Sequence, residues 1–244
     1  NSINPARNTI IFLHGWEGSS KSWESNTSKI NQHFNCIAID LPGFNLSSQP
    51  DKIWGVEEYS QFVRDFAQTL NLSKFVLVGK SFGGRVGILY ASKWPETLTH
   101  LILVAAAGLE KRSLLNQIKI SIAKIGKAFL FFLGPKYLES LRKHFYKATG
   151  IKKDSSDYKW KVKKLVTNIN LTKATEKISI PTLIVWGKND KVLPLSVGKD
   201  LNHKIKGSIF KQIDGGHNAH QESADQFNSL VEEFLINSFS ILKC

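Results

Sequence analysis

The chain has 244 residues, of which 42% are hydrophobic, so it can bury the core of one large domain. It carries 33 Lys and Arg against 20 Asp and Glu, a formal net charge of +13 at pH 7. No apolar run approaches the ~20 residues that cross a bilayer, and no secretory signal precedes the first predicted strand. We therefore expect a cytoplasmic protein, and whether its N-terminus is trimmed stays open.

Short apolar runs alternate with amphipathic patterns over most of the chain. The apolar runs predict strands at 9–13, 36–39, 75–78, 101–104, 183–186 and 208–213. Helical spacing predicts helices at 22–32, 56–70, 85–91, 194–201 and 224–236. This alternation indicates an α/β fold with a mostly parallel sheet and helices on both faces. The active site of such a sheet lies at the carboxyl ends of its strands.

The alternation stops between residues 109 and 177, where there are helical patterns but no clear strand. This segment holds 17 Lys and Arg and 5 Asp and Glu, a net charge of +12, whereas the remainder holds 16 and 15, a net charge of +1. The charge asymmetry of the protein therefore belongs to one central segment. The simplest interpretation is a solvated helical surface rich in lysine.

The stretch Gly79-Lys80-Ser81-Phe82-Gly83 follows a predicted strand and precedes a predicted helix. A serine at the apex of such a turn projects its hydroxyl clear of the sheet, and the flanking glycines leave the turn unobstructed. A phosphate-binding loop is excluded because its first glycine is replaced by a lysine. Chance occurrence of the pentapeptide is the remaining alternative. The adjacent lysine could attract anions, but its side chain is expected to point to solvent.

A serine hydroxyl needs a neighbouring base, and a histidine oriented by a carboxylate suits this task. His217 follows the last predicted strand after a pair of glycines, and Asp190 follows the strand before it. The order Ser81, Asp190, His217 is the one that accompanies this type of turn. Two alternatives stay open at this point: His220 is a rival base, and Asp190 could be a plain turn residue.

Five motifs, in order and each at a strand end, resemble those of the α/β-hydrolase superfamily, and the chain looks like a serine carboxylesterase-like member with a helical cap. The motifs are His14-Gly15-Trp16, Asp40-Leu41-Pro42-Gly43-Phe44, Gly79-Lys80-Ser81-Phe82-Gly83-Gly84, Trp186-Gly187-Lys188-Asn189-Asp190 and Gly215-Gly216-His217. The resemblance covers the chain apart from its central segment. One departure is that the first strands of the family's usual sheet are missing.

The resemblance implies the roles of individual residues. Ser81 would be the nucleophile, His217 the base and Asp190 the acid that orients it. The backbone N–H groups of Trp16 and Phe82 would form the oxyanion hole. Residues 1–108 and 178–244 would form the hydrolase core, and residues 109–177 a helical cap, or lid.

The resemblance also implies hydrolysis of carboxylic esters through an acyl-enzyme. A C–C bond hydrolase, a thioesterase or lipase, and a perhydrolase would share the same triad. A non-catalytic ligand-binding protein is the alternative from another class. No cofactor is expected, and the histidines and cysteines lack the spacing of a metal site. We expect a small-molecule ester as substrate, no nucleic acid, and at most weak attraction of anionic lipids or substrates by the basic segment. The sequence leaves the oligomeric state open.

Overall fold

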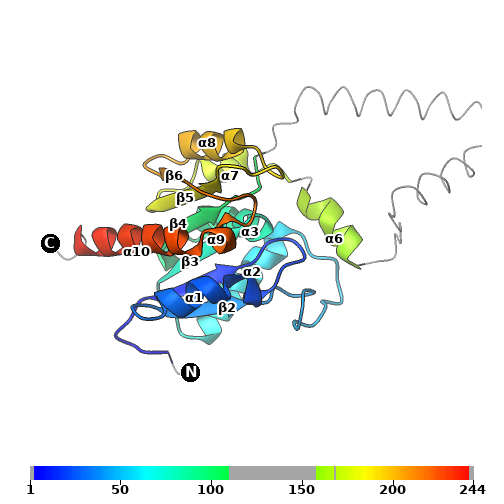
Figure 1. Cartoon of the computed structure of the whole chain (residues 1–244). Coiled ribbons are helices and arrows are strands. Elements are labelled where there is room, and N and C mark those ends of the chain that lie inside the picture. Colours follow the sequence, from blue (N-terminus) through cyan, green and yellow to red (C-terminus); the bar gives the residue numbers. More distant parts are fainter. Residues whose placement is uncertain (1–2, 110–157, 168, 242–244) are drawn as a thin grey trace, which may run out of the picture. The chain divides into compact units, whose positions relative to one another are not determined.

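The computed structural model describes residues 3–109, 158–167 and 169–241 (Figure 1). The chain divides into two compact units, of which the first joins residues 1–109 to 162–244 and the second holds residues 110–161. The fold and site discussed below belong to the first unit. Most of the segment 109–177, predicted to be a helical cap, lies outside the described residues, so the cap and its boundaries stay a prediction.

The described part of the chain contains a six-stranded sheet in which every paired strand is parallel, with the order β2-β1-β3-β4-β5-β6 (Figure 1). The strands are β1 (Thr9–Leu13), β2 (Asn35–Ile39), β3 (Phe75–Lys80), β4 (Leu98–Val104), β5 (Thr182–Gly187) and β6 (Ile209–Ile213). This confirms the mostly parallel sheet that the alternation of patterns predicts. The strand order reverses direction between β1 and β3, and ligands of such sheets bind at that switch point.

Helices cover both faces of the sheet (Figure 1). One face carries α1 (Glu24–Ile30), α9 (Ala219–Glu222) and α10 (Ala224–Ile241). The other carries α2 (Val56–Thr69), α3 (Phe82–Lys93) and α8 (Leu195–Lys204), with α7 (Thr172–Thr175) in contact with α3 and α8. The remaining elements are α6 (Tyr158–Thr167) and the 3-10 turns η1 (Ser20–Trp23) and η2 (Pro95–Thr97).

The core follows from the alternation of side chains along the buried strands. Val76 and Val78 of β3 pack in one cluster with Trp23 and with Phe227 of α10. Leu77, between them in the sequence, faces α3, where a Cβ on Gly87 would contact it. Both faces of the central strands are therefore apolar, which explains why they read as continuous hydrophobic runs rather than alternating ones.

The differences from the sequence-based expectation include the start of one strand and one short helix. Strand β4 begins at Leu98 rather than at residue 101, because the polar residues before Leu101 include a fully buried histidine, His100. Its ring contacts Phe234 edge-on, with 5.2 Å between the ring centroids. The short helix α9, which the sequence did not predict, follows the loop of His217.

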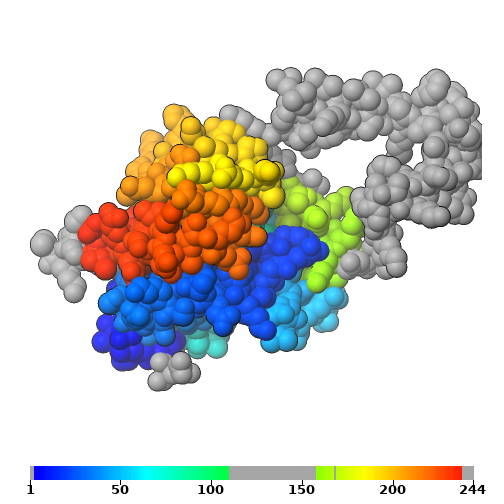
Figure 2. Space-filling view, viewed as in Figure 1, coloured from blue at the N-terminus to red at the C-terminus, as the bar shows by residue number. Residues whose placement is uncertain are grey.

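Elements from the first and the last third of the chain contact each other: α9 contacts η1 and α1. In the space-filling view, the orange segment that contains α9 lies beside the blue segment that contains η1 and α1 (Figure 2). The loop that carries His217 is therefore held against the region that follows β1, although about 200 residues separate them in the sequence.

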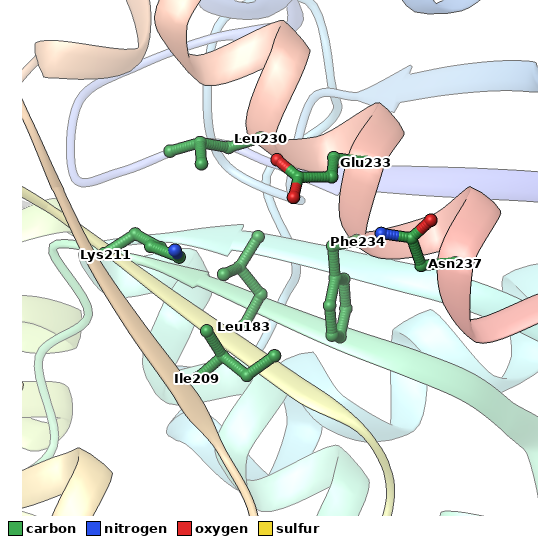
Figure 3. A pocket seen from close by; sticks show the side chains of 7 residues that line it. All are labelled: Leu183, Ile209, Lys211, Leu230, Glu233, Phe234 and Asn237. Carbon is green, nitrogen blue, oxygen red and sulfur yellow. The ribbon is translucent and has the colours of Figure 1, made fainter.

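A cavity of about 280 Å³ lies between the edge strand β6 and α10 (Figure 3). Its floor is apolar and includes Leu183, Ile209 and Phe234, and Lys211 and Glu233 also line it. Leu183 and Ile209 stand at the starts of β5 and β6, so this cavity is at the opposite strand ends from the motifs. Within the described ranges, no helix combines the length and the apolar character needed to cross a membrane.

Two histidines are buried in this fold. Burial lowers the pKa of His100 to about 4 and, with help from nearby cations, lowers the pKa of His220 to about 3. The unfolded chain therefore binds protons more readily than the folded chain at pH values below about 6.5. Stability that is fully present above this pH is lost as the pH falls toward the folded-state pKa values.

We expect the free energy of unfolding to fall by roughly 2 kcal/mol per buried histidine between pH 7 and pH 5. Urea unfolding at the two pH values measures the loss. In His100→Phe the fall in the free energy of unfolding should be smaller by roughly 2 kcal/mol, the contribution of one buried histidine. The control is His33→Gln, at an exposed position, in which the fall should be the same as in wild type. An equal pH dependence in wild type and His100→Phe would contradict the prediction.

Candidate active site

Ser81 lies at the apex of the turn between β3 and α3, with φ 50° and ψ −104°. Such a conformation is unfavourable for a residue with a side chain and persists only when its surroundings enforce it. Here the enforcement is close packing. A Cβ on Gly79 would collide with the carbonyl oxygen of Gly83, and a Cβ on Gly83 would lie 2.5 Å from the carbonyl oxygen of Leu13. The glycines flanking the serine are therefore required by space.

Backbone hydrogen bonds fix the same turn. The N–H of Ser81 donates to the carbonyl of Val104 at 2.9 Å, which ties the turn to β4. The carbonyl of Ser81 accepts from the N–H groups of Ala107 and Arg85 at 3.1 and 3.2 Å. Hydrogen bonds to β4, to the residues that follow β4 and to the first turn of α3 thus fix the position of the serine.

Three side chains from distant parts of the sequence meet beside this turn. The Nε2 atom of His217 lies 3.1 Å from the hydroxyl oxygen of Ser81. Its Nδ1 atom lies 2.8 Å from Oδ2 of Asp190. The histidine side chain is 15% exposed and the aspartate side chain 1%. The structure therefore brings together the three residues that the sequence singled out, as one hydrogen-bonded chain.

The carboxylate of Asp190 is held in its ionised form. Burial raises the pKa of this carboxyl, but hydrogen bonds from His217 and from the backbone N–H groups of Leu193 and Val192 outweigh it and leave the pKa below its ordinary value. The two backbone donors reach Oδ1 at 2.9 and 2.8 Å, so Oδ2 is left for the imidazole. An ionised acceptor requires the histidine to carry its proton on Nδ1, which leaves Nε2 free to accept from the serine.

The loops that carry the acid and the histidine are bonded to each other. The N–H of Asn189 donates to the carbonyl of Gly215 at 2.9 Å. The N–H of Gly216 donates to the carboxylate of Glu222 at 2.6 Å, which fixes the glycine pair to α9. These contacts set the distance between Asp190 and His217 independently of their own hydrogen bond.

The loop after β1 approaches Ser81 from the other side. Leu41 donates its N–H to Nε2 of the buried His14 at 3.0 Å, so Nδ1 of that ring donates to the carbonyl of Gly15 at 2.7 Å. Burial lowers the pKa of His14, which keeps the ring neutral for these two roles. Trp16 follows Gly15 in this loop. In the ranges that the structure describes, the backbone N–H groups of Trp16 and Phe82 donate to no backbone acceptor.

Four aromatic rings hold these two N–H groups in place. Trp16 contacts Phe44 and Phe82 edge-on, at centroid distances of 5.2 and 5.6 Å. Tyr59 of α2 contacts Phe82 edge-on at 5.1 Å and donates its hydroxyl to the carbonyl of Pro42 at 3.0 Å. The sequence did not predict this support by Phe44 and Tyr59. The available signals were the place of Phe44 in a motif and the place of Tyr59 on the apolar face of a predicted helix.

The structure distinguishes the two histidines that follow the last strand. His220 is 1% exposed and lies against Trp23, with 4.4 Å between the ring centroids, so it belongs to the core rather than to the site. The expectation for Lys80 was wrong: its side chain is partly buried and lies over Gly15 instead of pointing to solvent.

Among the residues that the structure describes, no group of His, Cys, Asp and Glu side chains is arranged to hold a metal ion. The site offers a hydroxyl, an imidazole, a carboxylate and two backbone donors. This set can carry out nucleophilic acyl transfer, since it provides a nucleophile, a proton acceptor and a place for an oxyanion.

The chain is similar to known proteins over most of its length. It is 27% identical over 248 residues to the AB hydrolase superfamily protein YisY of Bacillus subtilis, covering 92% of this chain and 90% of the relative. It is 25% identical over 261 residues to a 2-hydroxy-6-oxononadienedioate/2-hydroxy-6-oxononatrienedioate hydrolase of Klebsiella pneumoniae, covering 96% and 89%.

Solved structures share the fold. A bacterial membrane phospholipase A superposes with a TM-score of 0.76 at 22% identity, covering 97% of this chain and 81% of that one. The enol-lactonase of Burkholderia xenovorans superposes with a TM-score of 0.72 at 18% identity, covering 94% and 92%. The family model for the alpha/beta hydrolase fold matches residues 8–130, half of the chain. With the parallel sheet and the strained serine turn, these matches show that the chain belongs to the alpha/beta hydrolase family.

Proposed function

We propose that this hydrolase cleaves carboxylic esters, with Ser81 as nucleophile, His217 as general base and Asp190 as the acid that orients it. The observation that carries the proposal is the hydrogen-bonded chain Ser81–His217–Asp190 on a strained turn. A merely structural serine would not need a conformation that close packing must enforce. The buried ionised carboxylate behind the imidazole supports the same interpretation.

In the acylation step, the hydroxyl oxygen of Ser81 attacks the ester carbonyl while its proton moves to Nε2 of His217. The imidazolium that results lies against the ionised Asp190, which stabilises its charge. The proton then passes from Nε2 to the leaving alkoxide, which departs as an alcohol. The ester bond is broken and an acyl-serine ester is formed.

Water completes the cycle in a deacylation step. In this step water is the nucleophile and the oxygen of Ser81 is the leaving group. His217 accepts a proton from water, and the hydroxide adds to the acyl carbonyl. The imidazolium returns this proton to the oxygen of Ser81 as the acyl–serine bond breaks. The acid is released and the serine is regenerated, so no co-reactant beyond water is needed.

The backbone N–H groups of Trp16 and Phe82 would stabilise the negative charge that develops on the carbonyl oxygen. The support for this role is that both lie beside the serine turn and have no competing backbone acceptor in the described residues. A preorganised donor of this kind contributes about 3–4 kcal/mol to transition-state stabilisation. The aromatic contacts of both residues would limit the movement that otherwise weakens such donors.

C–C bond hydrolysis on the same three residues is the second candidate. It is favoured by the similarity to the Klebsiella hydrolase, whose substrate is a 2-hydroxy-6-oxo acid. The two reactions are separated by comparing kcat/KM for a short p-nitrophenyl ester with that for a 2-hydroxy-6-oxo-dienoate. A higher value for the dienoate would replace the ester proposal by the C–C one.

The first prediction on function concerns Ser81→Ala. Turnover of a short p-nitrophenyl ester should fall by about 10³-fold or more, because no other group in the site can form the acyl-enzyme. Wild type should also be labelled once per chain by a fluorophosphonate, with the adduct at Ser81. The control is Ser28→Ala, at an exposed position on α1, which should behave as wild type. Equal turnover by wild type and Ser81→Ala would refute the enzyme proposal.

A second prediction concerns Asp190→Asn. The amide would keep the size of the side chain but lose the ionised acceptor that sets the histidine tautomer, so kcat should fall by about 10³–10⁴-fold. Steady-state kinetics with the same ester measures the change, and thermal unfolding checks that the variant is folded. A loss below tenfold in a folded variant would show that the acid is not Asp190.

We further propose that the basic segment 109–177 attracts anionic esters to the site, because it carries 17 of the 33 basic residues. For a matched anionic and neutral ester pair, kcat/KM should favour the anion at an ionic strength of about 0.01 M. The preference should vanish at about 1 M, where the Debye length falls to ~3 Å. A preference that is the same at both ionic strengths would contradict electrostatic attraction.

A further inference from the structure

Lys80 is the last residue of β3 and directly precedes Ser81. The alternation of the strand places its side chain on the same face as Val76 and Val78, which is the face that α10 covers. The side chain is partly buried rather than extended into solvent. A lysine next to the nucleophile is therefore enclosed in the framework of the site.

The position of its ammonium group follows from the space around Gly15. A Cβ on that glycine would lie 2.8 Å from Cδ and 3.1 Å from Nζ of Lys80, and 3.4 Å from Cβ of Ser81. The ammonium and the nucleophile thus converge on one point, at the loop that leads to the N–H of Trp16. A side chain at residue 15 would therefore displace the end of the lysine side chain.

In the part of the chain that the structure describes, no ion pair neutralises the charge of this ammonium. Within the described ranges, no carboxylate pairs with Lys80, although the two carboxylates of Asp190 and Glu222 attract it from a greater distance. Burial of an unpaired cation disfavours the folded state, so a purely structural role would be served better by an apolar side chain of similar length. The cost indicates a use of the charge.

We propose that Lys80 is a positioning residue of the ester hydrolysis described above, on which this inference rests. Its ammonium places a fixed positive charge beside Ser81 and the Gly15–Trp16 loop, where the substrate's carbonyl oxygen becomes negative. This role does not require the lysine to touch the substrate. It acts through its field on the oxyanion and by its contact with the loop that carries one of the donors.

This role predicts an alkaline limit to activity. Burial lowers the pKa of Lys80 below its ordinary value, although Asp190 and Glu222 oppose the shift. As the pH rises through this pKa, the field at the oxyanion is lost and the rate falls. The titratable groups that face the ammonium come from the ends of β1, β5 and β6 and from α9, and they are His14, Asp190, His217, His220 and Glu222.

The test measures kcat and KM for a neutral p-nitrophenyl ester from pH 6 to about pH 10.5, corrected for spontaneous hydrolysis. Lys80→Met keeps the length of the side chain and removes the charge. We expect kcat to fall about tenfold with KM within about twofold, and the alkaline decline to disappear. Lys80→Arg should keep most of the rate and move the decline to higher pH, since arginine stays protonated. Lys74→Met, at an exposed position before β3, is the matched control and should behave as wild type.

Two results would overturn the inference. One is a wild-type kcat that stays level to about pH 10.5. This measurement uses the wild-type protein alone, so it does not depend on whether a variant folds. The other is a folded Lys80→Met with wild-type kcat and alkaline behaviour. Failure of the proposed function is recognised separately, because Ser81→Ala would then retain activity whatever Lys80→Met does.

Discussion

The close approach of the β3–α3 turn to the end of β1 is the constraint on which the site depends. The N–H of Gly83 donates to the carbonyl of His14 at 3.2 Å, and no side chain could be accommodated at that glycine. This contact forces Ser81 into its positive φ and presents its hydroxyl above the sheet. It also sets the distance between the serine and the loop of Trp16. One packing contact therefore positions both Ser81 and the N–H groups of Trp16 and Phe82, to which we assign the roles of nucleophile and oxyanion donors.

His217 and Asp190 are positioned by a second, independent set of contacts. Backbone bonds join the loops after β5 and β6, and the carboxylate of Glu222 fixes the glycine pair before His217. Because Asp190 accepts two backbone N–H groups on one oxygen, its other oxygen is directed at the imidazole. The imidazole then needs only to bridge two groups that are already in place. The 3.1 Å contact between Nε2 of His217 and the hydroxyl of Ser81 follows from this arrangement.

The strands and the three central residues could be predicted because their signals are local. A buried strand needs a continuous apolar run, and the sharp turn that carries Ser81 needs glycines at fixed spacing around the serine. The choice between His217 and His220 depended on the glycine pair, and the structure places His220 in the core. The start of β4 was missed because His100 is polar, and burial of a neutral histidine leaves no trace in the hydrophobic pattern. The environment of Lys80 was missed for a related reason: it is created by Gly15 and α9, which are distant in the sequence.

Two opposite charges, those of Asp190 and Lys80, lie on different sides of Ser81. Asp190 is a buried anion on the histidine side, where a positive charge would form during attack, and Lys80 is a partly buried cation on the loop side, where a negative charge would form. The attraction between them is too distant to be an ion pair, so neither charge cancels the field of the other at the reacting atoms. A pair placed at contact distance would be more stable in the folded protein and less useful, because its field would be confined to the space between the partners. The separation of these two charges across Ser81 thus supports the proposal that the site is organised for a reaction in which charge separates.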